Sequence, residues 1–307
     1  MRIITRRISS TRKVPLKTDP SRSRKVYKFK YFWSDTKKPV SPAIKEYVSK
    51  LKIPPNIDNS TVEIYWPKQS KILARWKDSK NRYQYLYNTD FIKKKSKDKF
   101  KRSSGIDKDF KKICKRLKDL YKKSKNTKVK NSALILYIIA RTGFRIGSNR
   151  DTRGVSKAYG ISTLLNKHVR MDNNCSPRKR NVTFDFIGKK GVRNYKSIND
   201  SWLCNQLKNY KKKEWSEPIF NVSDVFVRNV LNKVTRGKYQ IKDFRTHLAN
   251  KIALKEISKR KGPAKNERQF KKWQNEVADK VAKELGNTRK VTLEKYIDPR
   301  VWKPWYP

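Results

Sequence analysis

Short runs of alternating apolar and polar residues fill the first third of the chain, a spacing typical of β-strands with one buried face. A stretch with helical spacing and a proline at its start, residues 42–51, interrupts them. The predicted strands are VYKFKYFW (26–33), TVEIYWP (61–67), ILARW (72–76) and RYQYLY (82–87). The pattern therefore predicts a small α+β unit with an antiparallel sheet, ending near Phe91.

After residue 105 the apolar spacing indicates helices. They are predicted over 107–124, over the strongly apolar 131–144, over 241–257 and over 267–286, which Gly286 closes. Residues 181–198 differ, because every second residue is apolar before a glycine-flanked Lys189-Lys190 turn, and this predicts a β-hairpin. The second part of the chain is thus expected to be mainly α-helical with one hairpin.

Two segments lack a clear period. Residues 1–25 are rich in Arg, Lys and Ser and indicate a flexible basic arm that could lie along phosphates, or simply a solvated tail. Residues 93–105 (KKKSKDKFKRSSG) are charged and contain Ser and Gly, which is typical of a linker. We therefore expect an arm over 1–25, an α+β domain over 26–94 and a mainly helical domain over 95–307.

Charge narrows the choice of partner. The chain has 80 Lys+Arg against 26 Asp+Glu, a net charge of +54, while 36% hydrophobic residues allow folded cores. A folded protein with so large a positive charge has a strongly basic surface, which favours nucleic acid as its binding partner. By charge alone, a non-enzymatic packaging protein and a nucleic-acid enzyme are both compatible with the sequence.

The sequence shows no motif for a disulfide framework, a metal site, a membrane span or ATP binding. Cys114, Cys175 and Cys204 lie far apart without a CxxC pair, so we expect neither a disulfide framework nor a zinc site, and a reducing intracellular compartment. No apolar run approaches the roughly 18 residues of a membrane span, so a soluble protein is expected. A GxxxxGK[ST] loop and a metal-type carboxylate cluster are absent from the sequence, which argues against ATP, metal and other cofactors.

Candidate chemistry centres on Tyr296, which lies in a short apolar run near the end of the chain. A phenol has a pKa of about 10, so a tyrosine nucleophile needs nearby cations. Arg145 follows an apolar helix between two glycines and is expected to line a site, because burying it unpaired would be costly. Arg245 near the start of a helix could bind phosphate or be plain surface charge, and Lys189 at the hairpin tip could be solvated or enter a groove.

Strand 82–87 combines aromatic, amide and cationic side chains. Period-two alternation places Tyr83, Tyr85 and Tyr87 on one face and Arg82, Gln84 and Leu86 on the other. Aromatic rings can contact sugars and thymine methyl groups, and Gln can read adenine. An ordinary aromatic sheet face would show the same pattern.

Several sequence motifs occur in one order: GFRIG, YGISTL, FDFIGKKGV, KDFRT, LGNT and YIDPR, preceded by KDSKNRYQYLY. From about Ile53 to Trp302 the chain resembles type IB DNA topoisomerases, most closely the small poxvirus-type enzymes. The resemblance implies a monomer that closes as a C-clamp around duplex DNA. It also implies that Tyr296 forms a transient 3′-phosphotyrosyl bond, so that supercoils of both signs relax without ATP or metal.

The resemblance also implies roles for individual residues. Arg145 and Arg245 would bind the non-bridging phosphate oxygens, and Lys189 would protonate the leaving 5′-oxygen, although Lys190 beside it could share that role. Asn287 stands where many relatives have histidine, and would bind the phosphate or serve only as a turn residue. The residues expected to contact DNA are Arg82, Gln84, Tyr85, Tyr87, Lys190 and Lys242.

Rival interpretations remain. A tyrosine recombinase shares this constellation, but usually has histidine at the position of Lys242; a packaging protein would not explain the ordered motifs. The protein is expected inside the cell with DNA. Abundant Lys, Asn and Ile indicate an AT-rich genome, which with the family suggests a large DNA virus, and thus a virion or viral replication site, with the nucleus as alternative.

Overall fold

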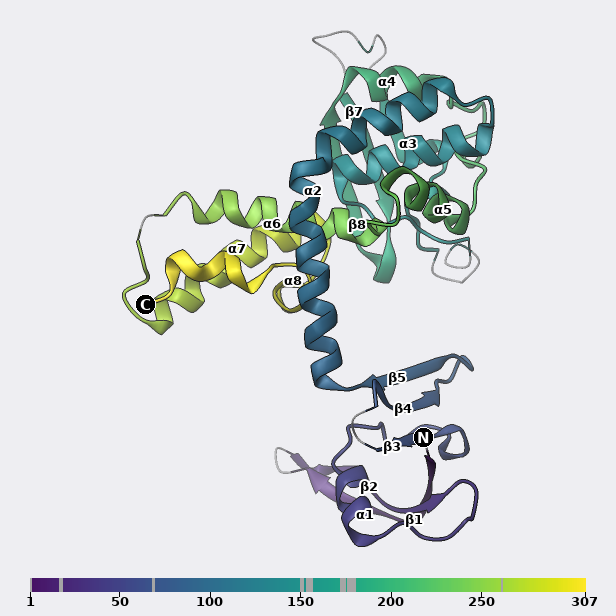
Figure 1. Ribbon diagram of the computed structural model, residues 1–307, viewed down its shortest axis with the longest axis vertical. Helices are drawn as coiled ribbons and strands as arrows, with labels where there is room; N and C mark the ends of the chain where they lie inside the picture. Colours follow the sequence, from purple (N-terminus) through teal and green to yellow (C-terminus); the bar gives the residue numbers. More distant parts are fainter. Residues whose placement is uncertain are drawn as a thin grey trace. The chain divides into compact units, whose positions relative to one another are not determined.

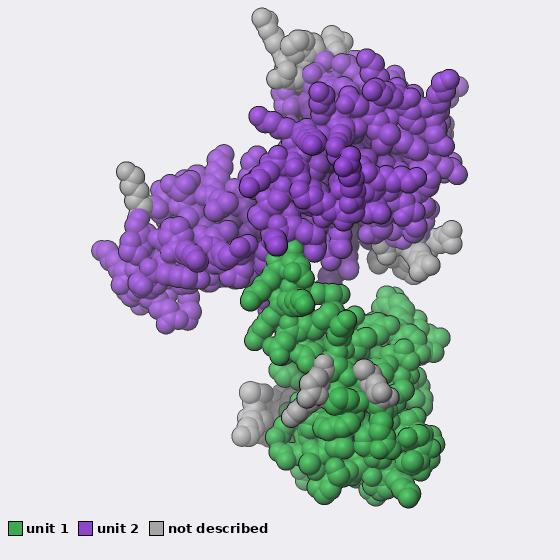
Figure 2. Space-filling model, viewed as in Figure 1, with its two compact units in different colours: residues 1–98 green, residues 99–307 purple. Residues whose placement is uncertain are grey.

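The computed structural model describes residues 2–16, 19–67, 70–149, 152, 157–171, 175, 181–260 and 262–307 (Figure 1). The chain divides into two compact units, residues 1–98 and 99–307 (Figure 2). Each unit contains its own sheet, and the helices lie mostly in the second. The fold is α+β, as the sequence predicts. No helix in the described parts of the chain is long and apolar enough to cross a membrane.

The first unit is built on an antiparallel sheet in the order β2-β1-β3-β4-β5. Its elements are β1 (Arg2–Leu16), β2 (Asp19–Trp33), α1 (Pro42–Ser49), β3 (Glu63–Trp66), β4 (Ile72–Lys77) and β5 (Tyr83–Tyr87). Ile4, Val48 and Ile64 are among the buried residues that join the sheet to α1 in one core. The four predicted strands and the predicted helix are confirmed.

The expected basic arm is wrong for residues 2–16 and 19–25, which lie in the paired strands β1 and β2. The register runs antiparallel from Ile4 opposite Trp33 to Val14 opposite Arg24. Residues 7–13 of β1 are all exposed. A two-stranded ribbon that is exposed to water on both faces needs no alternation of apolar and polar residues, so the strand could not be predicted there from hydrophobic periodicity.

The second unit consists of helices around a small sheet, β6 (Val169–Met171), β7 (Asn181–Ile187) and β8 (Arg193–Asn199). Its helices are α2 (Thr89–Lys123, which begins in the first unit), α3 (Thr127–Thr142), α4 (Ser201–Lys208), α5 (Asp224–Thr235), α6 (Ile241–Ile257), α7 (Glu267–Leu285) and α8 (Arg289–Lys295). The predicted hairpin and the four predicted helices are confirmed; the first of these is the later part of α2.

The expected linker over 93–105 is also wrong, because these residues are helical and belong to the 35-residue helix α2. Phe100, Ser103 and Ile106 are buried, and Ile113 and Leu117 continue the same stripe. Lysine is a good helix former, so the lysine-rich exposed face does not break the helix but does dilute its apolar signal.

Helix α6 passes through two hydrophobic cores. Phe244 near its start belongs to the core around α3, α5 and β7, whereas Ala249 and Ala253 belong to the core shared with α7 and the C-terminal turn Pro299–Trp305. Figure 1 shows α6 and α7 running side by side. Residues of α6 between Phe244 and Ala249 are therefore held at the junction of the two cores.

The cysteines depart from the expectation of no disulfide. Cys175 and Cys204 form a disulfide bond with Cα atoms 5.6 Å apart, and Cys114 is free. The partners are separated by 29 residues, and this pairing depends on tertiary structure that no sequence spacing discloses.

Candidate active site

The end of α3 and the loop after it set the backbone of Arg145. Gly143 ends the helix in the left-handed region with φ 69°, and its N–H bonds to the carbonyl of Ile139. A Cβ on Gly160 would lie 2.3 Å from the backbone N of Gly147, so only glycine lets the two segments meet. The N–H of Ile161 then bonds to the carbonyl oxygen of Arg145 at 3.0 Å. The GFRIG and YGISTL motifs thus form one packed unit.

The β7–β8 hairpin brings Lys189 to the same place. Its turn closes through the Gly188 N–H, which bonds to the Val192 carbonyl at 2.8 Å, while Lys190 takes φ 64° at the tip. The Tyr159 N–H bonds to the carbonyl of Ile187 at 2.8 Å and ties the hairpin to the YGISTL segment. This hydrogen bond fixes the position of the hairpin turn, and with it Lys189 and Lys190, relative to the YGISTL segment.

Arg245 on α6 is only 3% exposed, so it is not surface charge. Its guanidinium donates to the carbonyls of Gly143, at 2.8 Å, and Leu285. Both acceptors lie at helix C-termini, where the backbone carries partial negative charge. Burial, with Arg145 nearby, lowers the pKa of Arg245 to about 10, while Tyr296 opposes the shift. The side chain therefore stays cationic near neutral pH.

Asn287 joins the two arginines. Its side-chain oxygen accepts from Arg145 at 2.8 Å and from Arg245 at 3.1 Å. Gly286 ends α7 and Thr288 caps α8, so the turn that carries Asn287 is fixed on both sides. Within the described chain, Asn287 Nδ2 and Arg245 Nε are buried without a hydrogen-bond partner.

Tyr296 is the C-cap residue of α8, is half-buried, and lies with its ring centroid 5.4 Å from the Arg245 guanidinium carbon. Asn250, one turn further along α6, holds the backbone around it. The Asn250 amide donates to the Tyr296 carbonyl at 3.0 Å and accepts from the Asp298 N–H at 2.7 Å. Sequence reasoning missed Asn250, because only the fold brings these residues together.

A cavity of about 340 Å³ collects these side chains. It is lined by Phe144, Arg145, Ile146, Gly147, Ser148, Ala158, Tyr159, Lys189, Arg228, Ile241, Lys242, Arg245 and Tyr296. Five of these lining residues are cationic and none carries a carboxylate. Arg228 on α5 was not predicted; it also pairs with Asp224 at 3.1 Å. Lys190 is exposed beside the cavity's Lys189 and is not among the lining residues.

Strand β5 presents the other predicted DNA contacts. Tyr83, Tyr85 and Tyr87 are 43%, 42% and 36% exposed on one face, with neighbouring ring centroids 6.4 and 5.9 Å apart. Gln84 donates to the carboxylate of Asp78 at 2.9 Å, and so does Arg82. The Arg82 guanidinium holds the pKa of Asp78 well below its usual range. The predicted alternation is confirmed, and Asp78 emerges as the residue that holds Gln84.

Comparison with known proteins shows the family to which the chain belongs. Residues 88–301 match the family model described as eukaryotic DNA topoisomerase I, catalytic core. The chain belongs to the DNA topoisomerase I family. It is thus an enzyme of the isomerase class, and the family implies DNA as its partner.

Sequence similarity to individual proteins also supports membership of the DNA topoisomerase I family. The chain is 29% identical to DNA topoisomerase 1B of Acanthamoeba polyphaga mimivirus over 88% of this chain and 82% of that protein. It is 24% identical to DNA topoisomerase 1 of Caenorhabditis elegans over 63% of this chain, but covers only 26% of that protein. With the human DNA topoisomerase 1 it shares 29% identity over 25% of this chain and 10% of the relative. The likeness to the viral protein extends over most of both chains and supports the type IB class.

The side chains that line this cavity would suit an anion. Among the described residues, no group of three or more His, Cys, Asp or Glu side chains is gathered as a metal site would require. A phosphate bound there would contact guanidinium and ammonium groups, of which Arg245 is buried. Electrostatic interactions with a buried charge are stronger than those in water.

Proposed function

We propose that the chain relaxes positive and negative supercoils in duplex DNA by breaking and rejoining one strand, without ATP or metal. The observation that carries this proposal is the single cavity that Tyr296 shares with Arg145, Lys189 and Arg245. A nucleophile and the cations that a phosphoryl transition state requires stand there together.

Tyr296 is proposed as the nucleophile. The phenol gives its proton to water as its oxygen attacks a backbone phosphorus, and the P–O bond to the 5′-oxygen breaks as the 3′-phosphotyrosyl ester forms. Lys189 donates a proton to the released 5′-oxygen. The free 5′-hydroxyl end rotates and then attacks the ester to restore the strand. Because the ester conserves the energy of the broken bond, no nucleotide hydrolysis is needed.

The arginines are proposed to bind the non-bridging oxygens, with Asn287 beside them. Planar guanidinium forks suit two oxygens at once. Asn287 Nδ2 and Arg245 Nε, both buried and unpaired among the described residues, offer further donors to the phosphate. Lys242, which lines the cavity, is proposed to contact DNA next to the scissile position.

Strand β5 is proposed to bind the duplex through Tyr85, Tyr87, Gln84 and Arg82, with Lys190 at the hairpin tip. A monomer closing around DNA inside a cell, in a viral replication site or virion or else in the nucleus, fits the net charge and the viral relative. With many phosphate contacts, affinity should fall steeply as salt rises.

The test is relaxation of supercoiled plasmid in EDTA without ATP, with the covalent complex trapped by denaturation. The native chain should relax both signs of supercoil and form a trapped complex, and Tyr296→Phe should lose both while still binding DNA. Tyr306→Phe, an exposed tyrosine, is the matched control and should behave as native. Tight DNA binding with no relaxation in the native chain would indicate a packaging protein, and joint molecules in place of relaxed circles would indicate a recombinase.

A further inference from the structure

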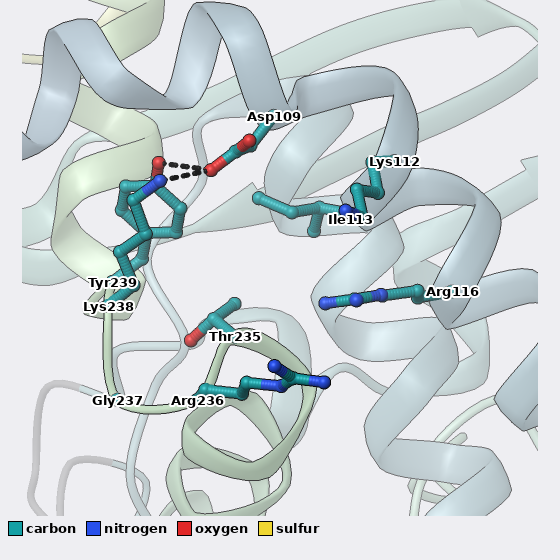
Figure 3. A pocket seen from close by; sticks show the side chains of 9 residues that line it. All are labelled: Asp109, Lys112, Ile113, Arg116, Thr235, Arg236, Gly237, Lys238 and Tyr239. Atoms are coloured by element: carbon teal, nitrogen blue, oxygen red, sulfur yellow. Dashed lines mark hydrogen bonds and ion pairs between the residues drawn. The ribbon is translucent and has the colours of Figure 1, made fainter.

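Helix α2 makes polar contacts with the catalytic elements along its length. Lys99 Nζ donates to the carbonyl of Lys295 at 2.7 Å, and Arg102 Nε donates to the carboxylate of Asp243 at 2.9 Å. Farther along, Asp109 accepts from Lys238 at 2.6 Å and from the Tyr239 hydroxyl at 2.7 Å (Figure 3). The segment predicted as a linker is thus part of the support of the active site.

The acceptor of Lys99 lies directly before the nucleophile. Lys295 is the last residue of α8, and Tyr296 caps that helix. A cation at a helix C-terminus interacts favourably with the partial negative charge of its carbonyls. The ammonium of Lys99 therefore holds the backbone from which the Tyr296 side chain extends.

The next contact fixes α6 from the same helix. Asp243 is fully buried and, besides Arg102, accepts from the N–H of Gln240 at 2.9 Å, which caps the start of α6. Arg245 follows two residues later on α6. Lys99 and Arg102, less than one helical turn apart on α2, thus reach the two helices that carry Tyr296 and Arg245.

We propose that Lys99 is a positioning residue for the reaction: by holding the carbonyl end of α8 against α2, it keeps the Tyr296 phenol in line with the phosphate bound by Arg245. This inference rests on the proposed function of Tyr296. It assigns an active-site role to a lysine outside the cavity, acting through the backbone of α8 without touching the substrate.

The charge of Lys99 can be followed by pH. Burial lowers its pKa to about 8, helped by Lys295 of α8 and Lys242 of α6, while Asp243 of α6 and Asp298 after α8 oppose the shift. Lys99 is a protonated ammonium below this pH and becomes a neutral amine as the pH rises through it. A neutral amine still donates a hydrogen bond, but a weaker one.

The experiment measures single-turnover formation of the covalent complex on an oligonucleotide duplex between pH 6.5 and 9.5. Lys99→Met, Lys99→Arg and the control Lys111→Met, an exposed lysine of the same helix, are each compared with the native chain at every pH. The ratio of the variant rate to the native rate at each pH removes any pH dependence that the variant and the native chain share.

Lys99→Met should cleave about tenfold more slowly at pH 7, the difference between a charged and a lost hydrogen bond, and this deficit should shrink as pH rises through 8. Lys99→Arg should cleave at the native rate at pH 7. Above pH 8 its cleavage rate relative to the native chain should rise, because its guanidinium stays charged. DNA affinity, measured in the Tyr296→Phe background, should be unchanged. Native cleavage by Lys99→Met at pH 7, or a parallel loss of DNA affinity, would overturn the proposal.

Hydrogen exchange keeps this test separate from that of the proposed function. In Lys99→Met the amides of residues 289–296 should exchange faster, while those of α7 keep their native protection. Unchanged exchange in 289–296 would overturn the positioning role whether or not the native chain cleaves DNA. Absence of any covalent complex in the native chain, with faster exchange in the variant, would refute the proposed function alone.

Discussion

Asn250 offers the sharpest test of how the fold positions Tyr296, the proposed nucleophile. Its amide bonds to the carbonyl of Tyr296 and to the N–H of Asp298, on either side of Ile297. It also donates to the carbonyl of Thr246 within its own helix, at 2.7 Å. Replacing it with alanine removes both tertiary contacts and leaves α6 otherwise intact, because alanine is the best helix former.

The expected cost follows from the two lost contacts. A typical hydrogen bond contributes about 1 kcal/mol net, and a partner left buried and unpaired costs about 1–3 kcal/mol. Two such losses amount to about 2–6 kcal/mol, which is a decrease of about 30-fold to about 10⁴-fold if it appears entirely in the cleavage barrier. DNA affinity should hardly change, since Asn250 is not among the described residues that line the cavity.

The assay is single-turnover covalent-complex formation, together with DNA affinity in the Tyr296→Phe background. Asn250→Asp should be at least as slow as Asn250→Ala, because it keeps the acceptor for Asp298 but turns a carboxylate oxygen toward the Tyr296 carbonyl. Asn229→Ala, which removes the same side chain from an exposed site on α5, should cleave at the native rate. A native rate in Asn250→Ala, or a proportional fall in cleavage and affinity, would refute the reasoning.

Three further predictions concern charge. Lys189→Ala should slow cleavage of ordinary DNA but not of DNA with 5′-sulfur at the scissile bond, because a thiolate leaves without a proton. The same result for Lys190→Ala instead would mean that Lys190, and not Lys189, is the general acid. Asn287→Asp should raise the thermal midpoint while reducing cleavage, since a carboxylate would form ion pairs with Arg145 and Arg245 and reduce the positive charge available to phosphate. Burial lowers the pKa of His168 to about 4 and that of His247 below its usual value, so the unfolded chain alone gains protons as pH falls below about 6.5. The free energy of unfolding should therefore decrease from pH 7 to 5, and a constant urea midpoint over that range would contradict this.

Apolar periodicity predicted the elements that carry the site, because those elements are buried on one face or throughout. Helix α3, the β7–β8 hairpin and helices α6 and α7 fall where the pattern places them. The sequence also predicted five of the side chains that line the cavity, namely those of Arg145, Lys189, Lys242, Arg245 and Tyr296, since a reacting phosphate restricts which residue types can surround it. Their roles in cleavage stay predictions until the variants are measured.

The missed features depend on contacts between distant residues. Asn250 reaches Tyr296 across 46 positions, and nothing in the sequence around it marks that contact. Arg228 is one of 80 Lys and Arg residues, so its place in the cavity could not be distinguished by composition. Residues 93–105 and 2–16, which were predicted as a linker and an arm, belong to α2 and β1. Both are rich in lysine and arginine and have wide exposed faces, so few apolar residues are left to show a helical or strand period.

Helix α6 shows how the fold separates structural charge from charge kept for a ligand. At its start Asp243 is paired with Arg102, so that the two charges cancel in a buried structural contact. Two residues on, Arg245 is buried against the neutral oxygens of Gly143, Leu285 and Asn287, which solvate the guanidinium without cancelling its charge. A carboxylate there would lower the cost of burial but would compete with phosphate. The C-termini of α3 and α7 therefore give Arg245 neutral hydrogen-bond acceptors that leave its positive charge uncompensated, as its proposed role in binding phosphate requires.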